Sequence, residues 1–547
     1  MSYPGDGKLP IIYVRGFGGG NIEGAVDDPF YGFSTGSVHV RADGCGNPQF
    51  YQFESPLLRL ITDEHYEVPV HGDQVRYLEH ADKGKVNAAT VWIHRFYDDS
   101  APSLRQNKPT DFSIEQAAIS LFNLIRLVLA KTGAPKVFLV AHSMGGLICR
   151  SMLQRVIPEH EARGGDLDLK AGEKYVARLF TYATPHGGIK FDVGGGFLEW
   201  LRDTTRFQGS EIFGPDRMYE YLTPDALQEA HPQERFDGTK LPEGSFDPKK
   251  IFCLVGSNPE EYKAVLGLSS AAVGVKSDGL VQLDNAVVDG AHKAIVHRSH
   301  SGRYGIVNSE EGYQNLNRFL FGDLQVTLEM VGFAVGEKNV PEELEFQLDV
   351  GLAIRGLPVL VHEQTAAHHC PVLVERLKEA DPIDSPRPLL TTFLSSRASR
   401  PRVRGAEVPY LRHSLKLRLM SIREEAVDRP DDVVSDEGLF EDDSDQKRIL
   451  FDDHMEQTED WTDTLTVDIE PPDEQRKLPI AWAVWSSDIP LTVRGWNHRD
   501  ETPLEDLAPD EPGKWVGEIG VPKFSRQLLG DKARIRITAS PRSVDSD

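Results

Sequence analysis

Apolar runs of strand type alternate with helical patterns along the first part of the chain, up to about Phe321. Between two of these runs, apolar residues recur at helical spacing from Ile114 to Val128, with Asp111 or Ser113 as the cap and Gly133 as the stop. This alternation predicts an α/β fold with a mostly parallel sheet. The predicted strands are 9–14, 89–96, 136–141, 176–183 and 250–256.

After Phe321 the pattern changes to short runs in which apolar and polar residues alternate, separated by turn-forming residues. Such runs predict an all-β, sandwich-like region of about 220 residues, built as one or two modules. A helix is expected only near 371–380, and a loop at 385–405. The predicted organisation is an α/β domain over 1–322 followed by a β-rich accessory region over 323–547.

Composition and charge modify this picture in one place. The chain has 547 residues, 39% of them hydrophobic and 27% charged, which is typical of a soluble globular protein with two or more domains. The net charge of -25 is concentrated, because residues 424–463 contain 17 acidic and three basic side chains. We expect that segment to be an acidic loop or linker, and its charge repels phosphate, so no nucleic-acid partner is predicted.

Cysteine usage and the N-terminus bear on location. The four cysteines are scattered at positions 45, 149, 253 and 370, which predicts free thiols in a reducing compartment. The N-terminus lacks the basic residues of a signal peptide, and no run of about 18 apolar residues occurs. The prediction is a cytoplasmic protein, with leaderless export as the alternative.

The segment VFLVAHSMGG, residues 137–146, contains the candidate nucleophile. Ser143 follows a predicted strand and precedes a predicted helix, and a serine attacks only when a base takes its proton and donors bind the oxyanion. A tight strand-to-helix turn needs small residues two before and two after the serine, as Ala141 and Gly145 are. The N–H of Met144, at the start of the helix, would then point toward the oxyanion.

A second oxyanion donor is expected in a loop that follows an early strand. The segment IIYVRGFGGG, residues 11–20, ends in such a loop, and the N–H of Phe17 is the candidate. The same glycines allow two other interpretations, an ordinary tight loop or a phosphate cradle. No Gly-Lys-Ser/Thr follows, and Asn21 occupies the place of the third glycine of a dinucleotide fingerprint, so the cradle is disfavoured.

Four motifs together resemble the α/β-hydrolases of the lipase and esterase type, including lipases similar to the inositol deacylases that act on GPI anchors. The motifs are RGFGGG (15–20), AHSMGG (141–146), TYATPHGG (181–188) and SDGLVQLDNA (277–286). In that family the triad follows the order Ser, acid, His, so the resemblance implies Asp278 as the acid, with Asp284 as the alternative. Arg15 departs from the His-Gly of many relatives, but a backbone donor should survive this change.

The resemblance also places the histidine on a loop shortly before the last helix. That helix is predicted to begin after Ser309, its cap, and three histidines lie between Asp278 and it. His300 is closest to the helix and is the implied base, with His297 and His292 as alternatives. His300 would take the proton of Ser143 while Asp278 holds the imidazole tautomer.

Two further segments bear on ligands. Adjacent residues cannot easily share one tetrahedral metal site, so His368, His369 and Cys370 are not assigned a metal, and no cofactor is expected. Residues 187–248 are longer than a crossover requires, and the amphipathic stretch 196–207 within them suggests a cap or lid over an acyl site. A surface helix packed on the sheet is the alternative.

The sequence therefore predicts a carboxylic ester hydrolase, a lipase or esterase that cleaves lipid-like acyl esters through an acyl-enzyme. A phospholipase-type effector that targets membranes and a noncatalytic binding protein with a hydrolase fold are the alternatives. The expected partners are an acyl ester or lipid substrate and, for the β-rich region, a membrane surface or a protein.

Overall fold

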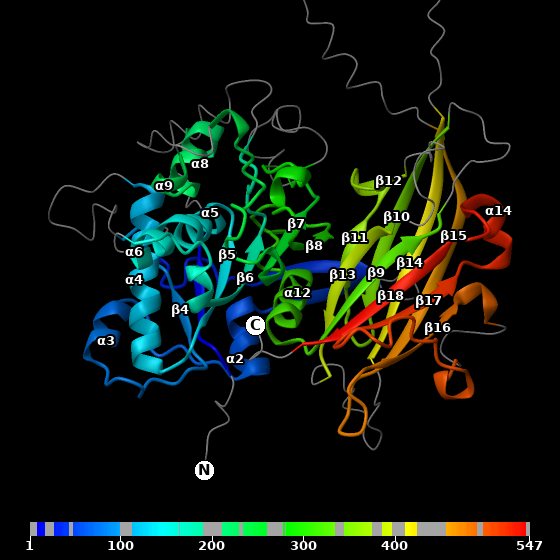
Figure 1. Ribbon diagram of the computed structural model, residues 1–547, viewed down its shortest axis with the longest axis horizontal. Helices are drawn as coiled ribbons and strands as arrows, with labels where there is room; N and C mark the ends of the chain where they lie inside the picture. Colours follow the sequence, from blue (N-terminus) through cyan, green and yellow to red (C-terminus); the bar gives the residue numbers. More distant parts are fainter. Residues whose placement is uncertain are drawn as a thin grey trace, which may run out of the picture.

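A computed structural model describes most of the chain (Figure 1). Among the described residues, no helix is both long and apolar enough to cross a membrane. The described residues are 8–16, 27–42, 48–98, 112–162, 165–189, 211–228, 233–259, 277–278, 280–333, 344–374, 386–396, 411–423, 456–489 and 496–542.

A six-stranded, fully parallel sheet forms the centre of the first region. All five strands expected from the sequence are present. The sixth, β8, was not predicted, because it is short and opens with His292 and Lys293, whose polarity hides the strand pattern. In spatial order the strands are β4 (Val91–Ile93), β1 (Ile11–Val14), β5 (Val137–His142), β6 (Val176–Tyr182), β7 (Ile251–Gly256) and β8 (His292–Val296).

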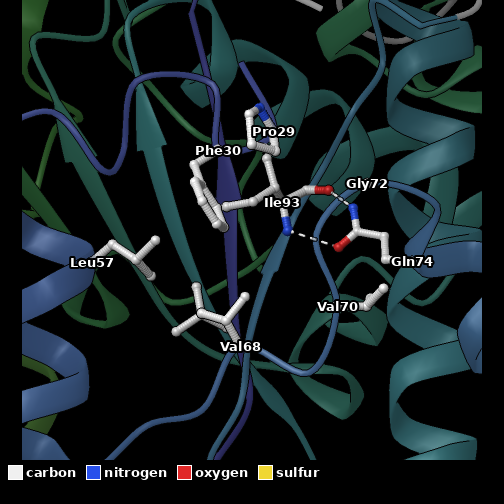
Figure 2. A pocket seen from close by; sticks show the side chains of 9 residues that line it. Pro29, Phe30, Leu57, Val68, Val70, Gly72, Gln74 and Ile93 are labelled. Carbon is white, nitrogen blue, oxygen red and sulfur yellow. Dashed lines mark hydrogen bonds between the residues drawn. The ribbon is translucent and has the colours of Figure 1, made fainter. Parts of the chain in front are cut away.

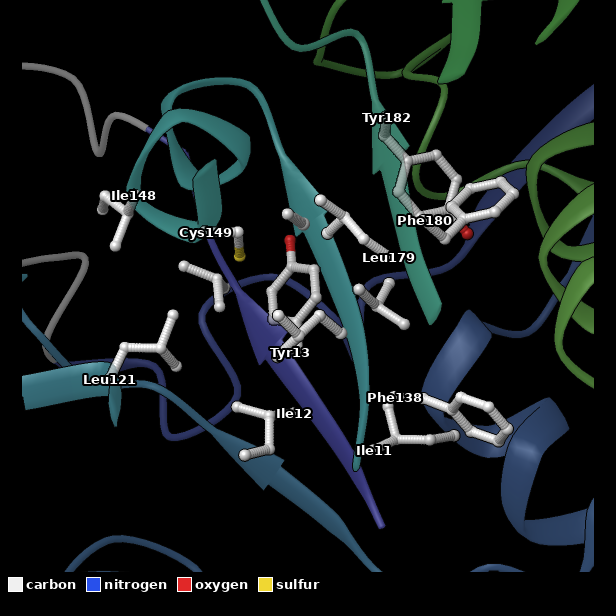
Figure 3. Packing of buried hydrophobic residues seen from close by; sticks show 14 of the residues in the cluster. Ile11, Ile12, Tyr13, Leu121, Phe138, Ile148, Cys149, Leu179, Phe180 and Tyr182 are labelled. Atoms are coloured by element: carbon white, nitrogen blue, oxygen red, sulfur yellow. The ribbon is translucent and has the colours of Figure 1, made fainter. Parts of the chain in front are cut away.

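The central strands are buried on both faces, which explains their continuous apolar sequences. Every residue of β1 and β6 is buried, and Ile11, Tyr13, Phe138 and Leu179 belong to the same core cluster as Ile148 of the helix after Ser143 (Figure 3). The register pairs Val14 of β1 with Ala141 of β5 at the carboxyl ends of these strands. These ends are therefore level, and Ser143 follows directly.

Helices pack on both faces of the sheet (Figure 1). At one side lie α3 (Gln74–His80), α4 (Ile114–Thr132) and α5 (Met144–Ser151), and at the other lie α2 (Pro56–Glu64) and α12 (Glu310–Phe321). The helix α4 begins after Ser113, whose Oγ accepts the N–H of Gln116, and ends at Gly133 with φ 74°, which confirms the predicted cap and stop. The described helices are α2 (Pro56–Glu64), α3 (Gln74–His80), α4 (Ile114–Thr132), α5 (Met144–Ser151), α6 (Ile157–Ala162), α8 (Pro215–Leu222), α9 (Asp225–Gln228), α12 (Glu310–Phe321) and α14 (Arg526–Leu529).

The helix α12 lies between the sheet and the β-rich region (Figure 1). It starts after Ser309, the predicted cap, whose Oγ accepts the N–H of Gly312. The last carbonyls of a helix lack intrahelical partners. Two arginines from outside the helix supply donors, since the guanidinium of Arg178 reaches the carbonyls of Phe319 and Leu320, and Arg542 also reaches Phe319. Both regions therefore fix this helix.

Antiparallel sheets make up the β-rich region, as predicted, and their inner faces share one apolar core. One sheet contains β11 (Leu360–Gln364), β10 (Leu344–Ile354), β14 (Leu411–Arg423), β15 (Glu456–Glu470) and β16 (Ile480–Trp485), with β12 (Val372–Val374) paired to β10. The other contains β13 (Arg387–Leu394), β9 (Leu324–Val331), β18 (Arg534–Pro541) and β17 (Trp515–Gly520). A separate hairpin, β2 (Ser37–Ala42) and β3 (Pro48–Phe53), belongs to the first region.

Three local expectations were wrong here. Residues 372–374 form strand β12 where a helix was expected, and 387–394 form strand β13 where a loop was expected. Residues 456–463, the end of the expected acidic loop, belong to β15, in which pairing with β14 stabilises an acidic but alternating sequence. The rest of that acidic segment, 424–455, lies outside the described residues.

Three cysteines, Cys149, Cys253 and Cys370, are free and buried, as predicted for thiols, while Cys45 lies outside the described residues. Burial raises the pKa of all three thiols. A buried thiol with a raised pKa is protonated at neutral pH and behaves as a small apolar side chain.

Candidate active site

Ser143 occupies the turn between β5 and α5 in a strained backbone conformation. Its φ of 53° and ψ of -128° are rare for a residue with a side chain. Three hydrogen bonds hold this turn: the N–H of Ser143 reaches the carbonyl of Tyr182 (2.8 Å), and its own carbonyl accepts from Thr184 Oγ1 (2.9 Å) and the N–H of Gly146 (3.0 Å). The strain is therefore supported by the neighbouring strand and helix.

Close packing explains the small residues around Ser143. A Cβ on Gly145 would lie 2.2 Å from the carbonyl oxygen of Val14, so the helix and β1 touch through backbone atoms. A Cβ on Gly16 would lie 2.5 Å from the Cβ of Ser143, which brings the end of the β1 segment beside the serine. Ala141 fits where many related motifs have glycine, and it is fully buried.

A parallel sheet flanked by helices, with a strained serine at a strand-to-helix turn, is the defining arrangement of one fold class. The first region has the α/β-hydrolase fold. We refer to residues 8–321 as the hydrolase-fold region and to the described residues from Leu324 onward as the β-rich region.

The structure brings Ser143, Asp278 and His300 together. His300 Nε2 lies 2.9 Å from Ser143 Oγ, and His300 Nδ1 lies 3.0 Å from Asp278 Oδ2. All three residues are buried, with exposed fractions of 5% for Ser143, 1% for Asp278 and 3% for His300. A carboxylate can only accept, so Nδ1–H donates to Asp278 and leaves Nε2 of neutral His300 to accept from the serine hydroxyl.

The loop after Asp278 fixes the carboxylate. Its Oδ1 accepts the backbone N–H groups of Leu280 (3.0 Å) and Val281 (2.8 Å), which leaves Oδ2 directed at His300. The backbone N–H of His300 also donates to the carbonyl of Asp278 (3.1 Å). The imidazole and the carboxylate are thus held by main-chain contacts as well as by each other.

His142 contributes a contact that the sequence did not indicate. Its Nε2–H donates to the carbonyl of His300 (3.0 Å), and the two rings lie 5.1 Å apart. Burial, and then the charge that His300 can carry, lower the pKa of His142 to about 3. His142 is therefore neutral at neutral pH, and it supports the backbone of His300 without adding charge beside the imidazole.

The alternative residues lie elsewhere. His297 stacks on His368 of the β-rich region, and burial lowers its pKa to about 4. His292 packs its ring against Phe393 of β13, with a centroid distance of 5.1 Å. Asp284 is exposed on the short helix Leu283–Ala286. None of the three has a hydrogen bond to Ser143 or His300 among the described contacts.

Of the two expected oxyanion donors, only Met144 lies within the described residues. Met144 is the first residue of α5, and the first N–H groups of a helix have no intrahelical partner. Phe17 lies outside the described residues, which stop at Gly16 beside Ser143 and resume at Asp27.

A buried arginine ties part of the predicted cap to the helix after Ser143. Arg150 of α5 is 1% exposed, and its guanidinium donates to the carbonyls of His186 (3.0 Å), Gly238 (2.5 Å) and Lys240 (3.1 Å). Desolvation lowers the pKa of Arg150 to about 10, which still leaves it charged at neutral pH. The amphipathic stretch expected at 196–207 lies outside the described residues.

A small pocket beside β4 is separate from this site (Figure 2). It is small and partly open to solvent, and β1 separates β4 from β5. Gln74 pairs with both backbone groups of Ile93 and so occupies the hydrogen-bonding positions of the edge strand β4. The pocket therefore belongs to the edge of the sheet. Its lining is Pro29, Phe30, Leu57, Val68, Val70, Gly72, Gln74, Val91 and Ile93.

Within the described part of the chain, no group of three or more His, Cys, Asp or Glu side chains is arranged to hold a metal ion. His368 stacks on His297, and His369 is exposed.

Comparison with known proteins gave only distant similarity. No protein-family model and no curated protein matches the chain. Among solved structures, it is similar to the mature lipase BlEst2 of Bacillus licheniformis, with 15% identity, a TM-score of 0.30, and 58% of this chain and 95% of the other covered. It is also similar to phospholipase PlaB of Legionella pneumophila in complex with thio-NAD, with 12% identity, a TM-score of 0.29, and 75% and 84% covered.

A third similar structure is the putative cell surface hydrolase of Lactobacillus plantarum WCFS1, with 14% identity, a TM-score of 0.24, and 57% and 90% covered. At these TM-scores the similarity supports no functional conclusion. The fold is assigned from the arrangement of this chain's own strands and helices.

Proposed function

We propose that this protein is a serine hydrolase that cleaves carboxylic esters, with lipid-like acyl esters as the favoured substrates. The observation that carries the proposal is the continuous hydrogen-bond chain from Ser143 Oγ through His300 to Asp278, at a strained strand-to-helix turn. Nucleophile, base and orienting acid are the three groups that a serine needs for nucleophilic attack at neutral pH.

In the proposed reaction, Ser143 Oγ attacks the ester carbonyl while His300 Nε2 takes its proton. Asp278 holds Nδ1–H and stabilises the imidazolium that forms. His300 then returns the proton to the leaving alcohol, which departs and leaves an acyl-enzyme on Ser143. A water molecule, deprotonated by His300, attacks the acyl carbonyl and releases the acid.

The negative charge that develops on the carbonyl oxygen requires donors. The N–H of Met144 is the first proposed donor, because it follows the nucleophile directly at the start of α5. The N–H of Phe17 is the second, and the approach of Gly16 to Ser143 supports a donor from this segment.

The preference for lipid-like acyl groups rests on the sequence. The motif resemblance favours lipases and esterases, and the sequence pattern of the amphipathic stretch would make Phe197, Leu198 and Leu201 available to face an acyl chain in the proposed cap. The contacts of Arg150 also support the cap proposal. Its guanidinium, on the helix α5 that follows Ser143, binds the carbonyls of residues 186, 238 and 240.

A fluorophosphonate probe and a series of acyl esters test the proposal on the full-length chain. We expect the probe to label Ser143 and the Ser143→Ala variant to remain unlabelled. Among p-nitrophenyl esters, the wild type should favour medium or long acyl chains, and Ser143→Ala should lose about 10³-fold or more in kcat. A native chain that neither labels nor cleaves any ester would instead support a noncatalytic binding role.

A further inference from the structure

The segment His297–His300, here called the His300 loop, begins at the carboxyl end of β8, the edge strand of the parallel sheet. Each residue of this loop has its own contacts with the surrounding structure. Arg298 forms a two-bond ion pair with Glu311 of α12 (3.0 Å for each), and Ser299 exchanges backbone hydrogen bonds with Tyr304 and Ile306. The first residue of the loop, His297, pairs through Nδ1 with Ser257 Oγ (3.4 Å) and also contacts the β-rich region through its ring.

His297 and His368 form the closest parallel ring pair described in the protein. Their centroids lie 3.6 Å apart and their planes differ by 12°. His368 Nδ1 has no hydrogen-bond partner among the described residues. The described contact of His368 with the hydrolase-fold region is therefore the stacking of its ring face on His297. Because burial and the neighbouring His368 lower the pKa of His297 to about 4, the His297 ring is neutral at neutral pH and stacks without a charge of its own.

A rigid turn presents His368. The short helix Ala366–His368 is capped by Thr365, and Asp349 of β10 accepts from Thr365 Oγ1 (3.0 Å) and from the N–H of Ala366 (2.8 Å). Arg418 of β14 in turn donates to Asp349 (2.8 Å). A ring on such a turn has little freedom to move, so it can hold the ring that it stacks against.

Two more contacts join the β-rich region to the same edge of the sheet. The N–H of Ile295 in β8 donates to His362 Nδ1 of β11 (3.3 Å). Cys370 packs in a small apolar cluster with Val255 and Val281, and the N–H of Val281 binds the carboxylate of Asp278. The β-rich region thus touches the strand before the His300 loop and the loop that orients Asp278.

We propose that His368 is a positioning residue for His300: by stacking on His297, it holds the His300 loop, so that the β-rich region completes the active site. This inference rests on the proposed serine-hydrolase function. His368 makes no contact with Ser143 or with the reacting atoms and therefore acts only through the loop. A misplacement of a catalytic group by about 1 Å costs about 100-fold in rate, because the reacting atoms lose their alignment.

Two neighbouring histidines offer a matched test in the full-length chain. His368→Asn removes the ring at the stack, and His369→Asn makes the same chemical change at an exposed residue whose φ of 55° asparagine tolerates. We expect His368→Asn to lower kcat for a short p-nitrophenyl ester and the rate of fluorophosphonate labelling by about tenfold, with KM unchanged. His369→Asn should stay within about twofold of the wild type.

Rescue separates positioning from a general loss of structure. His368→Phe keeps a flat ring and should restore kcat to within about twofold of the wild type. If His368→Asn does not fold, His368→Leu, which keeps apolar volume without a ring, takes its place. Wild-type kcat in the ring-free variant, or no rescue by phenylalanine, would overturn the inference. Failure of the wild-type protein to react with the fluorophosphonate would overturn the proposed function itself. The wild type is measured first, so this outcome is distinguished from a failure of the inference about His368.

Discussion

At the scale of single residues, the site depends on which histidine reaches the serine. Three histidines within nine positions differ mainly in what surrounds them: Phe393 for His292, His368 for His297, and Ser143 with Asp278 for His300. Their local sequences do not distinguish a ring that packs from a ring that accepts a proton. What distinguishes His300 is its buried position between a carboxylate and a hydroxyl, which is the arrangement that a general base requires.

Substitution of His300 and His297 by alanine ranks the two residues by their effect on kcat. We expect His300→Ala to lower kcat by about 10³- to 10⁴-fold, because no other base lies within hydrogen-bonding distance of Ser143 Oγ among the described residues. His297→Ala should lower it by about tenfold or less, since only loop support is lost. Steady-state hydrolysis of a short-chain ester at neutral pH measures both, and the reverse ranking would refute the assignment of His300.

At the scale of elements, the turn between β5 and α5 sets the geometry. The helix starts while its backbone still contacts the end of β1, so the residue two after Ser143 has no room for a side chain. The residue two before it, Ala141, does have room for a methyl group. The motif therefore has one strict position and one tolerant position in this chain.

A pair of reciprocal exchanges tests this asymmetry. Gly145→Ala would place a Cβ 2.2 Å from the carbonyl oxygen of Val14, so we expect a loss of about 3 kcal/mol or more in the free energy of unfolding. Ala141→Gly should cost only about 1 kcal/mol and keep most esterase activity. Urea unfolding followed by tryptophan fluorescence compares them, and equal destabilisation by the two exchanges would contradict this account.

At the scale of the whole molecule, the two regions form one continuous structure. Phe393 of β13 lies in the core of the hydrolase-fold region, and Arg542, near the end of the described chain, stacks on Phe319 of α12 and on Phe393. His362 contacts the edge strand β8, and His368 contacts the His300 loop. The β-rich region therefore contributes to the packing of the hydrolase-fold region and contacts the loop that carries His300.

Buried histidines make the molecule sensitive to acid. Burial lowers the pKa of His142 to about 3 and those of His362 and His413 to about 4. The unfolded chain binds protons at these rings below about pH 6.5, whereas the folded chain does not until the pH approaches 4. The free energy of unfolding should therefore fall as the pH drops through this window, by about 1 kcal/mol for each ring between pH 7 and pH 5.5.

His413 provides the control for this prediction, because neither of its ring nitrogens has a hydrogen-bond partner in the described structure. His413→Leu removes a buried polar group, so it should not lower stability at pH 7. It should also reduce the fall in stability between pH 7 and pH 5.5 by about 1 kcal/mol, as measured by urea unfolding at each pH. An unchanged pH slope would contradict the shifted pKa of His413.

The sequence by itself determined the order and type of most elements. Strand and helix periodicity, the caps Ser113 and Ser309 and the stop Gly133 depend on neighbours within a few residues, and such neighbours are visible in the chain. The same local signals placed Ser143 at a strand-to-helix turn. They failed at β8, β12 and β13, where pairing with distant strands outweighs weak or misleading local patterns.

The motif resemblance implied Ser143, Asp278 and His300 as partners, but only the tertiary structure decided which side chains lie within contact distance. Ser143 and His300 are 157 residues apart, and the parallel sheet brings them together by aligning the carboxyl ends of its strands. The stack of His297 on His368 and the bond from His142 to the backbone of His300 also join residues that carry no shared sequence signal. Contacts of this kind depend on packing across the whole chain, which periodicity and motif spacing do not encode.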